Sequence, residues 1–245
     1  IQKLNASGNF LWAKVFGSSY GFGDRGWCIK VDASGNVYTT GFFQGTVDFD
    51  PGAGTFNLTF AGGGPAYSDV FIQKLDATGN FLWAKAFGST VDDRGLSITI
   101  DAFGNVYTTG FFEGTVDFDH GTGTFNLTSA GNRNLFIQKL DASGNFLWAK
   151  AFGSTSYDQG NSITVDASGN IYTTGFFEGT VDFDDGAGTF NLTSVGSSDV
   201  FIQKLDASGN FLWAKAFGGT SNDGGVSITV DASGNVYTIG GFQGT

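Results

Sequence analysis

The chain has 245 residues and a net charge of −11, with 40 Gly and 27 Phe against two Pro, one Cys and no Met. This acidic balance disfavours nucleic acid and anionic membrane surfaces as partners, because both attract basic patches. A single cysteine excludes an internal disulfide framework, and no run approaches the roughly 18 apolar residues of a membrane span. We therefore expect a soluble protein of short strands and tight turns.

The chain contains four nearly identical sequence repeats, the last of them partial. The string IQKL begins at Ile1, Ile72, Ile137 and Ile202, and FLWAK follows each time. A fixed period of this kind indicates that one supersecondary unit is stacked many times. We predict a single repeat domain over residues 1–245, with units of about 1–71, 72–136 and 137–201 and a partial unit at 202–245.

One repeat unit contains two predicted hairpins. Along residues 95–153, the strand SITI leads into a D-x-x-G-N turn at Asp101 and then into VYTTGFF. After a longer segment, LFIQKL leads into the same kind of turn and then into FLWAKAF. β-Branched and aromatic residues fit a pleated strand, and Asp, Gly and Asn close hairpins. Each repeat therefore predicts four strands.

Apolar residues occupy both alternation phases of these strands. In FLWAKAFG, one phase holds Phe146, Trp148 and Phe152, while the other holds Leu147 and two alanines. A sheet with one wet face would show cleaner polar alternation, so we expect both faces to be covered. Four-stranded sheets packed face to face around an axis are the blades of a β-propeller. The predicted fold class is all-β, a propeller of about four blade-equivalents.

The run FIQKLDASGNFLWAKAFG through SITVDASGNVYTTGFF resembles the SBBP-type β-propeller repeat of bacterial secreted and surface proteins. The resemblance covers most of each repeat and recurs in every copy. It implies a propeller fold and an extracellular or cell-surface location, but no particular activity. The segment TVDFDPGAGTFNLT lies outside the resemblance, and its pattern predicts a small extra hairpin between the second and third strands.

If the four strands of a blade are named A to D from the axis outwards, the chain begins at strand C and ends just after strand B. It then holds three complete blades, a C–D hairpin at one end and an A–B hairpin at the other. Three arrangements remain open. The half-blades pair to close a four-bladed ring, the chain is an excerpt of a longer array, or the ends complete neighbouring molecules.

The loops divide the aspartates into two groups. One face carries the D-x-x-G-N turns, whose side chains bond their own backbone and are interpreted as structural. The other face carries D-x-D-x-G in the extra hairpins and D-x-G in the D–A loops. Carboxylates and glycines in this pattern resemble part of a calcium loop, although the bidentate Glu of an EF-hand is absent. The candidate calcium ligands are Asp48, Asp50, Asp117, Asp119, Asp182, Asp184, Asp24, Asp93, Asp158 and Asp223. The alternative is that these are solvated turns that confer solubility.

No pattern of catalytic residues stands out. His120 replaces Pro51 and Asp185 at a variable repeat position, and Cys28 lies near the serines of the other strand-A copies. Neither has a triad partner in the sequence, so we predict no enzyme.

The first hypothesis is a non-catalytic extracellular scaffold with a structural or adhesive role on a bacterial surface. The alternatives are a calcium- or carbohydrate-binding propeller, and a filament subunit joined through its terminal half-blades. The partners expected are the chain itself or surface glycans.

Overall fold

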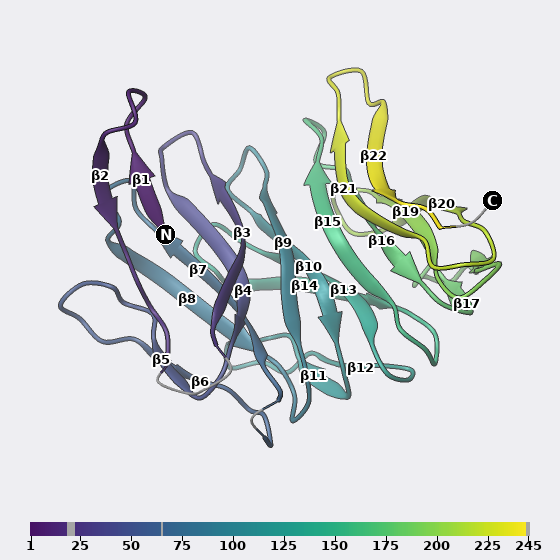
Figure 1. The fold of residues 1–245 in the computed structure, drawn as a ribbon, viewed down its shortest axis with the longest axis horizontal. Helices are drawn as coiled ribbons and strands as arrows, with labels where there is room; N and C mark the ends of the chain where they lie inside the picture. The colour runs from purple at the N-terminus through teal and green to yellow at the C-terminus, as the bar shows by residue number, and fades with distance from the viewer. Residues whose placement is uncertain (19–22, 65, 244–245) are drawn as a thin grey trace.

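The computed structural model describes residues 1–18, 23–64 and 66–243. Within these ranges the chain forms 22 β-strands and no helix, so none of the described residues belongs to a helix that could cross a membrane. The strands fan out as an arc of sheets, with the two chain ends at opposite sides (Figure 1).

Three antiparallel four-stranded sheets, here called blades one to three, make up most of the arc. Each sheet has the order A-B-C-D, as the sequence predicted. Blade one contains β3 (Arg25–Val31), β4 (Val37–Phe43), β7 (Asp69–Leu75) and β8 (Phe81–Phe87). Blade two contains β9 (Arg94–Ile100), β10 (Val106–Phe112), β13 (Asn134–Leu140) and β14 (Phe146–Phe152). Blade three contains β15 (Gln159–Val165), β16 (Ile171–Phe177), β19 (Asp199–Leu205) and β20 (Phe211–Phe217).

The D-x-x-G-N turns fix the register of each hairpin. The Oδ1 atom of Asp101 accepts hydrogen bonds from the backbone N–H groups of Phe103 and Asn105, both at 2.9 Å. Gly104 has a φ of +82°, which glycine adopts without the cost that a Cβ imposes. The strands then pair with Val106 opposite Ile100. The structural interpretation of this group of aspartates is therefore confirmed.

Both faces of blade two are covered, as the mixed apolar phases predicted, whereas strand β3 of blade one is largely exposed. Every residue of β10 is buried, although the strand includes two threonines and a glycine. A hydrophobic cluster joins Ile72 and Phe87 of blade one to Ile98, Val106 and Phe136 of blade two. The core is thus made at the contacts between blades, and a blade has no complete core of its own.

A small extra hairpin follows strand B in each complete blade. These loop hairpins are β5 (Thr46–Asp48) with β6 (Asn57–Thr59), β11 (Thr115–Asp117) with β12 (Asn126–Thr128), and β17 (Thr180–Asp182) with β18 (Asn191–Thr193). Val116 and Phe118 are fully buried. The Phe118 ring lies 4.9 Å from Phe87 of blade one, measured between ring centroids. Each loop hairpin therefore fills part of the space beside the preceding blade.

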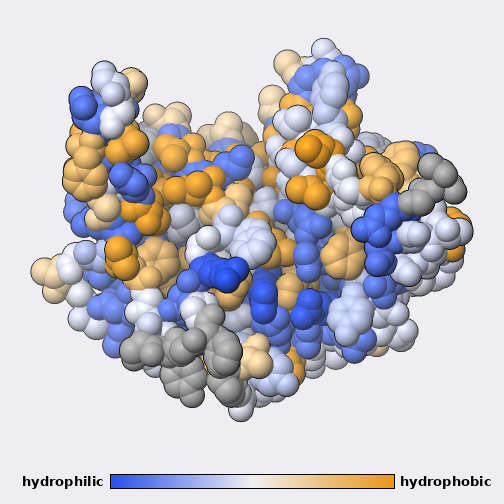
Figure 2. Space-filling model, in the orientation of Figure 1, coloured by the Kyte–Doolittle hydropathy of each residue, from blue (hydrophilic) through white to orange (hydrophobic). Residues whose placement is uncertain are grey.

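The remaining strands form two hairpins, here called the end hairpins. They are β1 (Gln2–Leu4) with β2 (Phe10–Ala13), and β21 (Gly224–Val230) with β22 (Val236–Gly241). Each forms a separate two-stranded sheet. They lie at opposite ends of the arc, as two projecting lobes with open space between them (Figures 1 and 2). The structure is an open arc, and the half-blades do not pair with each other to close a four-bladed ring.

Candidate functional site

The loop hairpins and the D–A loops lie together at one end of the blades, opposite the D-x-x-G-N turns (Figure 1). We call this surface the loop face. It comprises residues 44–60, 113–129 and 178–194 of the loop hairpins, and residues 88–93, 153–158 and 218–223 of the D–A loops. It contains nine of the ten candidate calcium ligands, while Asp24 lies beside it in the first D–A loop.

The first aspartate of each loop hairpin holds its turn together. The Oδ1 atom of Asp117 accepts hydrogen bonds from the N–H groups of Asp119 at 3.0 Å and Phe125 at 2.8 Å. The equivalent bonds of Asp48 and Asp182 have the same lengths. These carboxylates thus stabilise the hairpin before any ligand is considered.

The second aspartate of each loop hairpin folds over the glycines that follow it. Oδ1 of Asp119 accepts a hydrogen bond from the N–H of Gly121 at 2.9 Å. The other oxygen lies so close to Gly123 that a side chain at that position would overlap it. The same arrangement recurs at Asp50 and Asp184. The spacing of Asp and Gly in D-x-D-x-G-x-G is accounted for by this turn.

The aspartates of the D–A loops act as latches, that is, hydrogen-bonded links between a D–A loop and the end of strand B. Asp93, Asp158 and Asp223 are buried, and Asp24 is half-buried. Asp93 is fully buried, and its two oxygens accept hydrogen bonds from the N–H of Ser89 at 2.6 Å and the N–H of Glu113 at 2.9 Å. These bonds join the D–A loop to the end of strand B. Equivalent pairs of bonds are made by Asp24 with Ser18 and Gln44, by Asp158 with Ser154 and Glu178, and by Asp223 with Gly219 and Gln243.

Burial dominates the titration of two of these carboxyls, Asp93 and Asp158. Desolvation raises the pKa of Asp93 to about 8 and that of Asp158 to about 6, although the backbone hydrogen bonds act in the opposite direction. A proton on either carboxyl would remove one hydrogen-bond acceptor. Asp93 and Asp158 are therefore points at which pH can act on the contact between a D–A loop and the end of strand B.

His120 lies in a shallow cavity between the second loop hairpin and blade one. The cavity has a volume of about 270 Å³, and Asp69, Asp117 and Asp119 also line it. Burial is the main reason that the pKa of His120 falls to about 4, so its ring is neutral at pH 7. Burial also raises the pKa of Asp69 to about 6.

Across the described ranges, no group of three or more His, Cys, Asp or Glu side chains is placed to hold a metal ion. The structure assigns the ten candidate aspartates to turns and latches. The calcium hypothesis stays a prediction.

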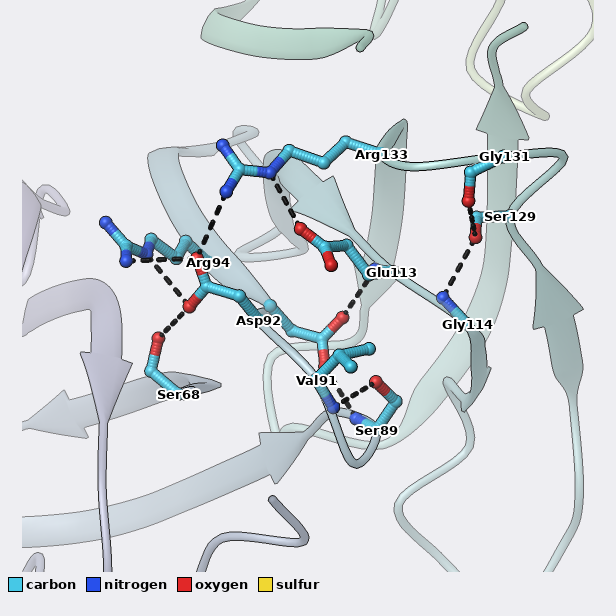
Figure 3. Close-up of polar contacts among 11 residues, drawn as sticks. Ser68, Ser89, Val91, Asp92, Arg94, Glu113, Gly114, Ser129, Gly131 and Arg133 are labelled. Carbon is cyan, nitrogen blue, oxygen red and sulfur yellow. Dashed lines mark hydrogen bonds and ion pairs between the residues drawn. The ribbon is translucent and has the colours of Figure 1, made fainter. Parts of the chain in front are cut away.

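A cluster of four charged residues on blade two was missed by the sequence analysis (Figure 3). Asp92, whose side chain is 7% exposed, lies 3.0 Å from Nη2 of Arg94 and 3.5 Å from Nη2 of Arg133. It also accepts a hydrogen bond from the hydroxyl of Ser68 of blade one at 2.7 Å. The Nε of Arg133 donates to Glu113 at 2.8 Å. Two carboxylates thus neutralise two guanidinium groups.

The two guanidinium groups of this cluster also lie over aromatic rings. Arg94 lies 4.5 Å from the ring centroid of Phe42 in blade one, and Arg133 lies 4.2 Å from that of Phe111 in blade two. Arg133 also reaches Tyr157, which precedes blade three, at 5.6 Å. The cluster therefore ties the three blades together at the loop face.

A departure from the repeat was the sequence signal for this cluster. Asp92 stands where the other copies have Gly23, Tyr157 and Asn222, and Arg133 stands where they have Ser68 and Ser198. Neither departure brings a nucleophile next to a general base. The cluster can bind and orient the loops, but its pairing of charges does not provide a route for group transfer.

Comparison with known proteins agrees with the fold. The family model described as SBBP, Beta-propeller repeat, matches residues 147–175. The chain is 26% identical over 250 residues to the uncharacterized WD repeat-containing protein L264 of Acanthamoeba polyphaga mimivirus, covering 89% of this chain and 17% of that protein. It is 25% identical over 170 residues to the regulatory protein FlaEY of Caulobacter vibrioides, covering 68% of this chain and 17% of that protein.

The chain thus spans about a sixth of the length of these two relatives. The Pan2 WD40 domain of Neurospora crassa is similar at 10% identity over 86% of this chain and 84% of that one. With a TM-score of 0.25, this similarity is too low to support a conclusion about the fold or the function of the chain.

Repeated four-stranded sheets that share their cores define a β-propeller repeat protein. The matched residues 147–175 run through strands β14, β15 and β16, so they cover the D strand of one blade and the A–B hairpin of the next. The match of the SBBP β-propeller repeat model to residues 147–175 confirms the resemblance seen in the sequence. None of the matches indicates an enzyme family.

Proposed function

We propose that this chain is a non-catalytic scaffold that acts at a bacterial cell surface, in a structural or adhesive role. One observation carries the proposal: the loop face presents the same hairpin three times, with the same internal hydrogen bonds. Catalysis needs one asymmetric constellation of groups, whereas repeated contact with a surface gains from identical copies. Weak binding by each copy adds up when the copies are held on one rigid frame.

The tips of the loop hairpins are the proposed contact points. Thr55, Thr124 and Thr189 occupy equivalent tip positions and are all exposed. Binding residues often lie on loops that a rigid scaffold positions. Surface glycans are the proposed partner, because a protein with a net charge of −11 suits neutral sugars better than polyanions.

Adhesion under flow tests this function. Beads coated with the chain are passed over films of bacterial cell-surface glycan, and their retention is compared with that of beads carrying Thr55→Lys, Thr124→Lys and Thr189→Lys singly, in pairs and together. Stepwise loss of retention is expected. The control carries Ser34→Lys, Ser168→Lys and Ser233→Lys, three exposed positions on the opposite face. If beads coated with the unmodified chain are not retained, the adhesive role is contradicted.

Labelling of intact source cells with an antibody against the chain tests the proposed location at the cell surface.

A further inference from the structure

Residues that depart from the repeat gather at one place on the loop face. Asp92, Arg133 and Tyr157 each stand where the other copies have different residues. Arg133 brings them together, because its guanidinium group contacts the Asp92 carboxylate and also lies over the Tyr157 ring. A chain of nearly identical units can form a single-copy binding site only where its copies differ. These departures therefore mark the position at which such a site can exist.

The two arginines of this cluster keep hydrogen-bond donors that no described residue uses. A guanidinium group has five N–H donors in a fixed plane. Arg94 uses Nε and Nη2 to bond Asp92, while Arg133 uses Nε for Glu113 and Nη2 for Asp92. One terminal nitrogen of each side chain carries no contact in Figure 3. The side chains of Arg94 and Arg133 are 34% and 31% exposed, so a ligand can reach these donors from solvent.

Aromatic rings and one carboxylate hold the two guanidinium groups in place. Arg94 lies over the ring of Phe42 and Arg133 over the ring of Phe111, so the N–H edges stay free. A single oxygen of Asp92, Oδ2, contacts Nη2 of both arginines. The two groups are therefore close together and are positioned before a ligand arrives, which lowers the entropy that binding costs.

Tyr157 adds an exposed aromatic surface beside these donors. Backbone hydrogen bonds hold it there: the N–H of Arg133 donates to the carbonyl of Ser156 at 3.1 Å, and the N–H of Asp158 donates to the carbonyl of Arg133 at 3.0 Å. The Arg133 guanidinium lies 5.6 Å from the centroid of the Tyr157 ring, and Tyr157 is 43% exposed. An exposed ring with a polar tip suits a ligand that has both an apolar face and hydroxyl groups, as a sugar does.

The free donors select the charge of the ligand. Neighbouring guanidinium groups match a carboxylate, which accepts several charge-assisted hydrogen bonds. The side chains of Asp92 and Glu113 are 7% and 23% exposed, less than those of the two arginines, so an approaching anion meets positive charge first. The net charge of −11 disfavours a polyanion, but a single carboxylate brings only one negative charge into that field.

We propose that Arg94, Arg133 and Tyr157 form a single-copy binding site for an acidic sugar. The two arginines bind the carboxylate of the sugar, and the tyrosine ring lies against the sugar ring. This inference rests on the proposed function, because it names one unit of the surface glycan that the scaffold contacts. The repeated hairpin tips supply many weak contacts, whereas this site recognises one acidic unit.

NMR of the arginine side chains tests the site directly. The chain has three arginines, so isotope-labelled arginine gives three Nε–H signals, and Arg25 is the internal control because it lies outside the cluster. Glucuronate is expected to shift the signals of Arg94 and Arg133 saturably and to leave that of Arg25 unchanged. Glucose and acetate are expected to bind at least about tenfold more weakly, since glucose lacks the carboxylate and acetate lacks the sugar ring.

Three outcomes of this titration would overturn the proposal. The first is that glucuronate shifts neither signal at about 50 mM, well above a Kd of about 1 mM. The second is that acetate binds as tightly as glucuronate, which would remove the sugar from the assignment. The third is that glucose binds as tightly, which would remove the carboxylate.

A matched variant tests the residues. Arg133→Ser together with Tyr157→Asn introduces the residues that the following unit has at the same positions, Ser198 and Asn222, so the fold already accommodates them. This variant is expected to bind glucuronate at least about tenfold more weakly. The control is Lys30→Gln, which also removes one positive charge, at an exposed position outside the cluster. Equal effects of the two changes would show that only net charge matters and would overturn the proposal.

Glucuronate binding and bead retention are independent measurements. If beads are retained but glucuronate shifts no arginine signal, the acidic-sugar site is overturned and the adhesive role is unaffected. If glucuronate binds but the beads are not retained, the adhesive role is contradicted and the site is supported.

Discussion

The A–B hairpin of blade two (β9 and β10) and the last end hairpin (β21 and β22) have nearly the same sequence, but they differ in how far they are buried. Tyr107 of β10 is fully buried, whereas Tyr237 of β22 is 56% exposed. Phe112 is fully buried and its equivalent Phe242 is 65% exposed. Since the residues are the same, the difference comes from the units that flank them. A strand of this kind has a core only when a neighbour provides it.

Local structure, by contrast, is unaffected by the position in the chain. In the last end hairpin, Asp231 accepts hydrogen bonds from Asn235 at 2.8 Å and from the hydroxyl of Tyr237 at 3.2 Å. Asp101 of blade two makes the equivalent bonds. The turn forms from residues that are close in sequence, and it therefore needs no neighbouring blade.

The largest contrast is expected for a core phenylalanine. Phe112→Ala leaves a cavity beside the second loop hairpin and is expected to lower the free energy of unfolding by about 3–5 kcal/mol. Phe242→Ala removes the equivalent, exposed ring and is expected to cost under about 0.5 kcal/mol in the monomer. Urea unfolding followed by tryptophan fluorescence measures both. Equal losses would show that the end hairpin is buried in solution.

A pH titration of stability distinguishes a latch from a turn. The pKa of Asp93 rises from 3.8 to about 8 on folding, so the folded state binds more protons between these values. Stability from this group is therefore greatest below pH 4 and falls as the pH rises through 8. Asp93→Asn is expected to flatten that fall in the free energy of unfolding.

Asp231→Asn is the control for this titration. The pKa of Asp231 is lowered, chiefly by the side-chain hydrogen bond from Asn235. Its contribution is present above pH 3.8 and is lost as the pH falls. Because Asp69 and Asp158 have pKa values raised to about 6, the part of the fall specific to Asp93 lies between about pH 6 and 8. A fall in that window that is unchanged in Asp93→Asn would show that another group causes it.

Calcium separates the two interpretations of the loop hairpins, which occur in the complete blades and not in the end hairpins. If Asp117 and Asp119 bind the ion, calcium at about ten times its Kd adds about 1.4 kcal/mol to the free energy of unfolding. Asp117→Asn with Asp119→Asn then abolishes that gain. Calorimetric unfolding with calcium and with chelator measures it, and an unchanged midpoint in the unmodified chain would contradict the hypothesis.

The smallest contrast is expected for the lysines that join blades. Lys139→Met removes a bond to Ala207 and is expected to cost about 1 kcal/mol. Lys204→Met removes the equivalent side chain, whose Nζ lies 4.9 Å from the ring centroid of Tyr172. Its cost in the monomer is expected to be within about 0.5 kcal/mol. Unfolding in urea at low protein concentration compares them, and equal costs would mean that Lys204 also has an acceptor.

The position of the functional groups was only partly predictable. The D-x-D-x-G motifs were identified as candidate ligands, but their carboxylates bond to nearby backbone N–H groups. The aspartates of the D–A loops could not be recognised as latches, because Asp93 bonds to Glu113, which lies 20 residues away. The cluster around Asp92 joins residues from separate segments, so the departures from the repeat at Asp92 and Arg133 mark its positions but do not reveal its contacts.

The sequence by itself determined the strands, their turns and the register of each hairpin. These depend on alternation, on Asp and Asn side chains that bond nearby backbone, and on glycine at positive φ, all of which act over a few residues. Tertiary structure decided which of the repeated residues are buried, where the carboxylates find their partners, and whether the ends meet. Those outcomes depend on contacts between units, and a repeated sequence carries the same letters whether or not a neighbour is present.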